Sequence, residues 1–243
     1  MPTAARVPLC GMVGRRSERG AYHPTMATAE FDVLLLDFGG VCLLNPVELH
    51  AKAERLLDLA PGTFQWMGPI DPSTDGLWRK MIAGDGITER EYWALRAKDV
   101  GAAADKDLDL RAYLGLLYEP PTPELIRPGA TTTVTAALAA GFGVSVLTND
   151  MRAFHGRQWE HGVEFLSLMD HIVDCSDTNI LKPDPRAFAR AEEIVGVPAS
   201  RMLFVDDQPR SVAGAEAAGL TAMWFDIANA ESSWADVAAR LQL

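Results

Sequence analysis

The sequence predicts an α/β protein: a mostly parallel sheet with helices on both faces, plus an inserted helical domain. A short apolar run at residues 31–36 ends in an acid and two glycines, as a buried parallel strand does at its carboxyl end. Residues 45–119 then have helical spacing without a convincing strand. Beyond residue 129, strand-like and helix-like segments alternate, which is typical of a parallel sheet.

Length and composition are those of an ordinary globular protein, with 243 residues, 48% apolar and 23% charged. The formal net charge of −11 disfavours nucleic acid and anionic membranes as partners. The three cysteines, Cys10, Cys42 and Cys175, match neither a disulfide framework nor a zinc motif, and Cys42 is interpreted as a packed thiol. We therefore expect a cytoplasmic protein with a small-molecule substrate, and the sequence leaves its oligomeric state open.

The first 29 residues are predicted to lie outside the folded unit. They are rich in arginine and lack the apolar segment of a secretory signal. We expect residues 1–29 to be a disordered extension or an over-called start, which leaves Met1 and Met26 as alternative first residues.

The next part of the chain is expected to form a helical cap at residues 45–120, inserted into a core made of residues 30–44 and 121–243. Thr88 with Glu91 has the pattern of a capping box. A proline-rich segment marks the return to the core. The helices expected in the cap cover residues 47–60, 76–84, 88–101 and 108–119.

The remaining chain completes the sheet. Strands are expected at residues 144–147, 171–176, 202–207 and 220–225. Helices are expected at residues 129–141, 158–169, 185–196, 209–219 and 232–241. Such alternation requires right-handed crossovers, which bring the carboxyl ends of all strands to one edge.

Polar residues follow the predicted strands at this edge, where open α/β sheets bind their ligands. The edge is therefore expected to collect three carboxylates, a hydroxyl, an amide and an ammonium group: Asp37, Asp206, Asp207, Thr148, Asn149 and Lys182. Each segment alone has a structural explanation as a strand end, a helix cap or a surface lysine. Their joint occurrence at strand ends carries the prediction of a site.

The carboxylates indicate the chemistry, because three of them cannot all stay ionised without a counter-charge. The positive charge of Lys182 balances only one of the three negative charges. A divalent cation with hard oxygen ligands resolves the conflict, and Mg²⁺ is the usual ion where phosphate also binds. One carboxylate is then free to attack phosphorus, while Thr148 and Asn149 can donate hydrogen bonds to the phosphoryl oxygens.

Four segments in chain order, DFGGV, LTND, LKPDP and FVDDQPRSVAGAEAAGL, resemble the motifs of the haloacid dehalogenase (HAD) superfamily. The resemblance covers about residues 31–243 and is to the subgroup with a helical, C1-type cap after the first strand. It implies a Rossmann-like core and a mobile cap that excludes water. It also implies that Asp37 is the covalent nucleophile and that Lys182 steadies both this nucleophile and the phosphoryl oxygens.

The resemblance further implies where the ligands bind. Mg²⁺ would be held by Asp37, the backbone carbonyl of Gly39 and Asp206, with Asp207 bound directly or through water. Thr148 and Asn149 would contact the transferring group, and the backbone at Gly40 can approach it closely.

One departure concerns Gly39. Phosphatases of this superfamily usually carry an Asp there, as acid to the leaving group and then base to water, a role worth about 10²–10⁴-fold in rate. Three interpretations remain open. The leaving group needs no proton, as in acyl or aryl phosphates; a cap residue among His50, Asp71, Asp75 and Glu89 supplies it; or catalysis has been lost.

The leading hypothesis is a Mg²⁺-dependent hydrolase of small phosphorylated metabolites that forms an aspartyl-phosphate on Asp37. One alternative is a metal-independent dehalogenase-like hydrolase, in which Asp37 displaces a halide from carbon. Another is a catalytically degenerate protein that binds phosphate or a partner. The adjacent acids Asp206 and Asp207 argue against the dehalogenase, whose fourth motif need not hold a metal.

Overall fold

The computed structural model describes residues 30–243. The predictions made for residues 1–29, including the choice between Met1 and Met26, lie outside the described residues.

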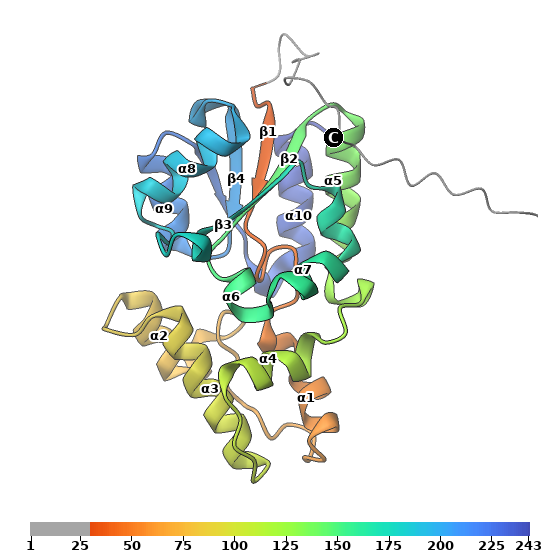
Figure 1. Ribbon diagram of the computed structural model, residues 1–243, viewed down its shortest axis with the longest axis vertical. Coiled ribbons are helices and arrows are strands. Elements are labelled where there is room, and N and C mark those ends of the chain that lie inside the picture. The colour runs from red at the N-terminus through yellow and green to blue at the C-terminus, as the bar shows by residue number, and fades with distance from the viewer. Residues whose placement is uncertain (1–29) are drawn as a thin grey trace, which may run out of the picture.

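A five-stranded parallel sheet forms the centre of the molecule, in the order β3-β2-β1-β4-β5 (Figure 1). The strands are β1 (Val33–Leu36), β2 (Gly143–Thr148), β3 (His171–Asp174), β4 (Met202–Asp206) and β5 (Thr221–Trp224). All four residues of β1 are buried, as expected for a central strand covered on both faces. The predicted α/β fold with a Rossmann-like parallel sheet is confirmed.

Helices cover the two faces of the sheet, and alternate residues of β1 face different layers. Leu34 and Leu36 belong to the apolar cluster that includes α5 (Pro128–Ala139) and α10 (Ala230–Arg240). Val33 and Leu35 belong to the opposite cluster, with α8 (Pro185–Val195) and α9 (Pro209–Ala217). This period of two is what a strand buried on both faces requires.

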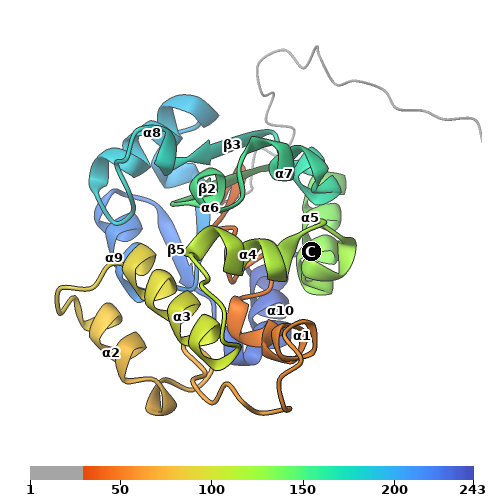
Figure 2. The ribbon, with the colours of Figure 1, turned by 60° about the horizontal axis from the view of Figure 1, so that its bottom comes forward.

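The helices between β1 and α5 lie beyond the carboxyl edge of the sheet (Figures 1 and 2). They are α1 (His50–Leu56), α2 (Gly76–Ala83), α3 (Glu89–Ala103) and α4 (Leu110–Tyr118). The predicted capping box of α3 is confirmed, since the Glu91 amide donates to Thr88 Oγ1 at 3.2 Å and the Thr88 amide donates to Glu91 Oε2 at 2.8 Å. The exact division into a cap at 45–120 and a core at 30–44 and 121–243 stays a prediction. No helix among the described residues is both long and apolar enough to cross a membrane.

Two predicted helices are shorter than expected. Residues 158–169 form α7 (Arg157–Gly162) followed by a 3₁₀ turn (Glu164–Leu168), because Val163 between them is extended, with φ −86° and ψ 100°. In the cap, α1 ends before Asp58, whose positive φ of 56° cannot continue a helix. A short helix, α6 (Met151–His155), was not predicted, because five residues carry no readable periodicity.

The burial of β1 predicts that truncating one of its side chains lowers the free energy of unfolding. Leu34→Ala should lower the free energy of unfolding by about 2–5 kcal/mol, because Leu34 is fully buried in the apolar cluster. Urea denaturation measures this loss. The matched change Leu56→Ala, at a side chain that is 53% exposed, should cost about 0.5 kcal/mol or less. Equal losses for the two variants would contradict this packing.

Candidate active site

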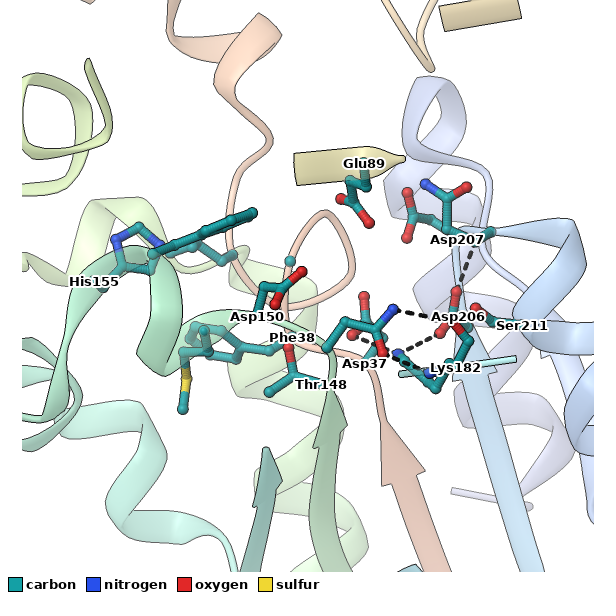
Figure 3. Close-up of a pocket in the computed structure, with 16 residues that line it drawn as sticks. Asp37, Phe38, Glu89, Thr148, Asp150, His155, Lys182, Asp206, Asp207 and Ser211 are labelled. Atoms are coloured by element: carbon teal, nitrogen blue, oxygen red, sulfur yellow. Dashed lines mark hydrogen bonds and ion pairs between the residues drawn. The ribbon is translucent and has the colours of Figure 1, made fainter. Parts of the chain in front are cut away.

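A pocket that is partly open to solvent lies between the carboxyl edge of the sheet and the helices beyond it (Figure 3). Its lining comes from the loop after β1, the start of α3, the β2–α6 junction, the Lys182 loop and the β4–α9 junction. Segments far apart in the chain therefore meet at one place. Most of the residues predicted for the site are among those that line it.

The sheet register brings the acids together. Leu36 is paired with Val205 of β4 and with Val146 of β2. The next residue along the chain is therefore Asp37 directly after β1, Asp206 at the end of β4 and Leu147 in β2, all at one level. Asp37 and Asp206 thus emerge side by side at the edge of the sheet, as the sequence predicted.

Lys182 joins these three strand ends. Its Nζ donates to Asp37 Oδ1 at 2.8 Å, to Asp206 Oδ2 at 2.6 Å and to the Leu147 carbonyl at 2.9 Å. The side chain is only 2% exposed, so these contacts lie in a region of low dielectric. All three protons of the ammonium group are used, which fixes its position between the carboxylates.

The electrostatics show an excess of negative charge. Burial raises the pKa of Asp37 to about 6, although Lys182 acts in the opposite direction. Burial, together with Asp206 and Asp37, raises the pKa of Asp207 well above its usual range. Burial lowers the pKa of Lys182, but Asp206 and Asp37 outweigh burial and keep the group charged. One ammonium group does not balance three carboxylates.

The acids are arranged as a cation site requires. One carboxylate oxygen from each of Asp37, Asp206 and Asp207 lies within 4.8 Å of the others. Hard oxygen donors and surplus negative charge fit a divalent cation such as Mg²⁺. Gly39 also lines the pocket beside them. Its predicted role as a carbonyl ligand stays a prediction.

The residues predicted to bind substrate differ in their contacts. Thr148 is buried and lines the pocket. Asn149 also lines it, but its side chain holds the Lys182 backbone: Lys182 N donates to Asn149 Oδ1 at 2.7 Å, and Asn149 Nδ2 donates to the Lys182 carbonyl at 3.3 Å. Asn149 therefore positions Lys182, a role that sequence reasoning missed.

Gly40 is not among the residues that line the pocket, but it lies next to Asp207, which does line it. Its φ is +80°, which favours glycine. A Cβ there would meet Ile227 Cδ1 at 2.8 Å and Asp207 Oδ2 at 3.2 Å. The glycine thus allows Asp207 to approach the turn after β1, and its predicted contact with substrate stays a prediction.

The four cap residues considered as proton donors are now distinguishable. His50 packs against Trp66, with ring centroids 4.3 Å apart. Asp75 is buried and accepts hydrogen bonds within the cap, and Asp71 caps a 3₁₀ turn. These three do not line the pocket, whereas Glu89 does.

Part of the pocket lining is apolar or aromatic, which the sequence did not predict. The residues of this part of the lining are Phe38, Leu43, Met151, Phe154 and His155. Burial lowers the pKa of His155 to about 3, so this side chain is neutral at physiological pH. Only Phe38, between Asp37 and Gly39, is adjacent to predicted site positions, and that adjacency was the one available signal.

The described cysteines behave as packed thiols. Cys42 and Cys175 are free and fully buried, while Cys10 lies outside the described residues. Burial raises the pKa of the Cys42 thiol well above its usual range, so it is no nucleophile at neutral pH.

Comparison with known proteins adds the family context. Residues 31–219 match the family described as haloacid dehalogenase-like hydrolase. The chain is 31% identical to phosphoglycolate phosphatase of Rhodospirillum rubrum over 154 residues, 58% of this chain and 61% of that protein. It is 27% identical to (S)-2-haloacid dehalogenase H-109 of Pseudomonas putida over 153 residues, 61% of this chain and 66% of that protein. It is 32% identical to phosphatase MT3486 of Mycobacterium tuberculosis over 99 residues, 41% of this chain. These alignments span between 46% and 66% of the relatives' own lengths.

Solved structures show the same fold. The magnesium-bound HAD-hydrolase YfnB of Bacillus subtilis matches with a TM-score of 0.61 and 22% identity, over 81% of this chain and 87% of that chain. The L-2-haloacid dehalogenase RSc1362 matches with a TM-score of 0.55 and 20% identity, also over 81% and 87%. Both phosphatases and dehalogenases are therefore among the relatives.

Binding of a cation to the three acids predicts a pH-dependent stabilisation. Without metal, the pKa of Asp37 is about 6 in the folded protein and 3.8 in the unfolded chain. Between these two pH values, the folded protein keeps a proton on Asp37 that the unfolded chain has lost. The contribution of Asp37 to stability is therefore fully present below pH 3.8 and is lost as the pH rises through about 6. Mg²⁺ should raise the melting temperature near pH 7.5, by an amount equivalent to about 2.7 kcal/mol at a hundredfold excess over its dissociation constant.

Near pH 4.5, Mg²⁺ should no longer raise the melting temperature, because protons and metal compete for the same carboxylate oxygens. The double variant Asp206→Asn/Asp207→Asn should show no rise at either pH. Differential scanning fluorimetry measures both effects. A rise of equal size in this variant would place the metal elsewhere.

Proposed function

Because the chain belongs to the haloacid dehalogenase-like hydrolase family, we propose that it is a Mg²⁺-dependent phosphatase of small phosphorylated metabolites, with Asp37 as nucleophile. The observation that carries the proposal is the convergence of Asp37, Asp206 and Asp207 around one buried lysine. Such a cluster of carboxylates and a lysine is typical of sites that bind a divalent cation together with a phosphoryl group.

Each group has a role in this reaction. Asp37 attacks phosphorus while Lys182 neutralises charge on the nucleophile and on the phosphoryl oxygens. Thr148, at the end of β2, lies where its hydroxyl can donate to the same oxygens. Mg²⁺, held by Asp37, the Gly39 carbonyl, Asp206 and Asp207, would supply further positive charge to the phosphoryl group when bound.

The phosphatase is favoured over a dehalogenase by the charge of the pocket. A haloacid brings its own carboxylate and releases a halide anion, so its site needs free positive charge. Among the described residues that line the pocket, Lys182 is the only group that stays cationic, and Asp37 and Asp206 already engage it. Without a metal, the site therefore offers no free positive charge to the haloacid carboxylate or to the departing halide.

Hydrolysis of 4-nitrophenyl phosphate tests the proposal. Activity should require Mg²⁺ and be abolished by chelation. Asp37→Asn should lower kcat by about 10³-fold or more, because the covalent route is lost. Asp85→Asn removes one charge from an exposed loop of the cap and should leave the rate unchanged. Phosphate release that survives Asp37→Asn would refute the proposed nucleophile.

A dehalogenase remains the second candidate, because (S)-2-haloacid dehalogenase H-109 is among the relatives. Incubation with 2-chloropropionate, with chelator present, distinguishes the two. We expect no chloride release from the wild-type protein. Metal-independent chloride release that is lost in Asp37→Asn would favour the dehalogenase and overturn the phosphatase.

A further inference from the structure

We propose that Glu89 of the cap is the general acid and base of the reaction, replacing the acid that is absent at Gly39. Its carboxyl group gives a proton to the leaving oxygen and later takes one from the attacking water. The inference rests on the proposed phosphatase function and adds a catalytic residue to it.

The position of Glu89 fits this role. Glu89 is the first residue of α3 and lines the pocket, on the side opposite Asp37 (Figure 3). In a phosphoryl transfer, the attacking and leaving oxygens lie roughly in line on opposite sides of phosphorus. Since Asp37 attacks from the sheet, the leaving oxygen must point toward the cap. Glu89 enters the pocket from that side.

Contacts between the cap and the core hold this part of α3 in place. Arg90, the next residue, forms an ion pair with Asp150 and donates from Nε to Asp150 Oδ1 at 2.8 Å. It also donates from Nη1 to Asn179 Oδ1 at 3.2 Å. Both partners belong to the core. Arg90 therefore links the start of α3 to the segment that follows β2, next to the residue that enters the pocket.

The carboxyl group of Glu89 is restrained but available. Trp93 Nε1 donates to Glu89 Oε1 at 3.4 Å, and the capping box of Thr88 and Glu91 fixes the backbone of the first turn. Within the described part of the chain, no lysine or arginine forms an ion pair with Glu89, although its neighbours are strongly charged. A carboxyl group in a pocket without a cationic partner is suited to proton transfer.

The charges around Glu89 favour its protonated form. Burial raises the pKa of Glu89 to about 7, and Asp37 and Asp150 contribute in the same direction. Asp207 also faces it, while Lys182 acts in the opposite sense. The positive end of the α3 dipole acts against the rise in the pKa of Glu89, because it favours a negative charge at the first turn of the helix.

The fold does not force a glycine at position 39. A Cβ built on Gly39 would meet no atom within 4 Å, and its backbone is outside the left-handed region. Gly40, by contrast, is closely surrounded and has a φ of +80°. The missing acid at Gly39 is therefore not a steric requirement. An acid on the cap side removes the need for one there.

The proton and electron balance closes over two steps. In the first, a bond forms between Asp37 Oδ and phosphorus, the ester P–O bond breaks, and the Glu89 proton moves to the leaving oxygen. In the second, Glu89, now a carboxylate, takes a proton from water as the water oxygen bonds to phosphorus. The bond from Asp37 to phosphorus then breaks, and phosphate leaves with both carboxyl groups in their starting forms.

The test is the dependence of kcat/KM on the leaving group, measured by phosphate release from esters ranging from 4-nitrophenyl to simple alkyl phosphates. The value of kcat/KM reports the step in which the leaving group departs. In the wild type, the rate should depend weakly on leaving-group pKa. Glu89→Gln should lower kcat/KM for alkyl phosphates by about 10²–10⁴-fold and for 4-nitrophenyl phosphate by less than about tenfold, because nitrophenolate leaves without a proton.

Two further variants make the result decisive. Asp85→Asn, which removes an exposed cap charge shortly before α3, should keep the wild-type dependence. Gly39→Asp in the Glu89→Gln background should restore alkyl phosphate hydrolysis, since the open space at Gly39 accepts an acid. A merely structural role for Glu89 would slow aryl and alkyl esters equally and would not be rescued at Gly39.

Failure of this inference is distinguishable from failure of the proposed function. A wild-type protein that needs Mg²⁺ and Asp37 but whose leaving-group dependence is unaffected by Glu89→Gln overturns the role of Glu89 alone. A wild-type protein that releases no phosphate from any ester, whether or not Mg²⁺ is present, overturns the phosphatase itself.

Discussion

A single buried ammonium group shared between carboxylates of two strands is the constraint around which the site is built. Lys182 lies between Asp37 and Asp206, and its third proton goes to the Leu147 carbonyl of the strand on the other side of β1. These contacts require the ends of β1, β2 and β4 to be level, which the parallel register ensures. The fold thus delivers the charges to one point before any ligand binds.

The same arrangement leaves the site out of electrostatic balance. The raised pKa values of Asp37 and Asp207 show that these two acids ionise less readily in the folded protein than in the unfolded chain. Such crowding opposes folding, and functional sites commonly retain it for the chemistry it permits. The cap adds another carboxyl group, Glu89, above the same pocket. A bound cation would supply the positive charge that Lys182 alone does not, and the phosphoryl group would bind between the cation and Lys182.

Much of the fold and the core of the site could be predicted from the sequence, because the signals are local. An apolar run that ends in Asp37 or Asp206 identifies both the strand and its ligand-binding end. The role of Asn149 could not be read, because its partner is the backbone of Lys182, 33 residues away. Glu89 could not be separated from His50 or Asp75, because the contact between Arg90 and Asp150 that places it spans 60 residues.

The central claim is that Asp37 takes the phosphoryl group, and trapping this intermediate tests it most directly. The protein is quenched in acid during turnover of a phosphate ester with Mg²⁺, digested and examined by mass spectrometry. We predict one added phosphoryl group on the peptide that contains Asp37, absent after chelation and more abundant in Glu89→Gln, where water attack is slowed. Turnover with that peptide unmodified, or with the phosphoryl group on another residue, would contradict the account.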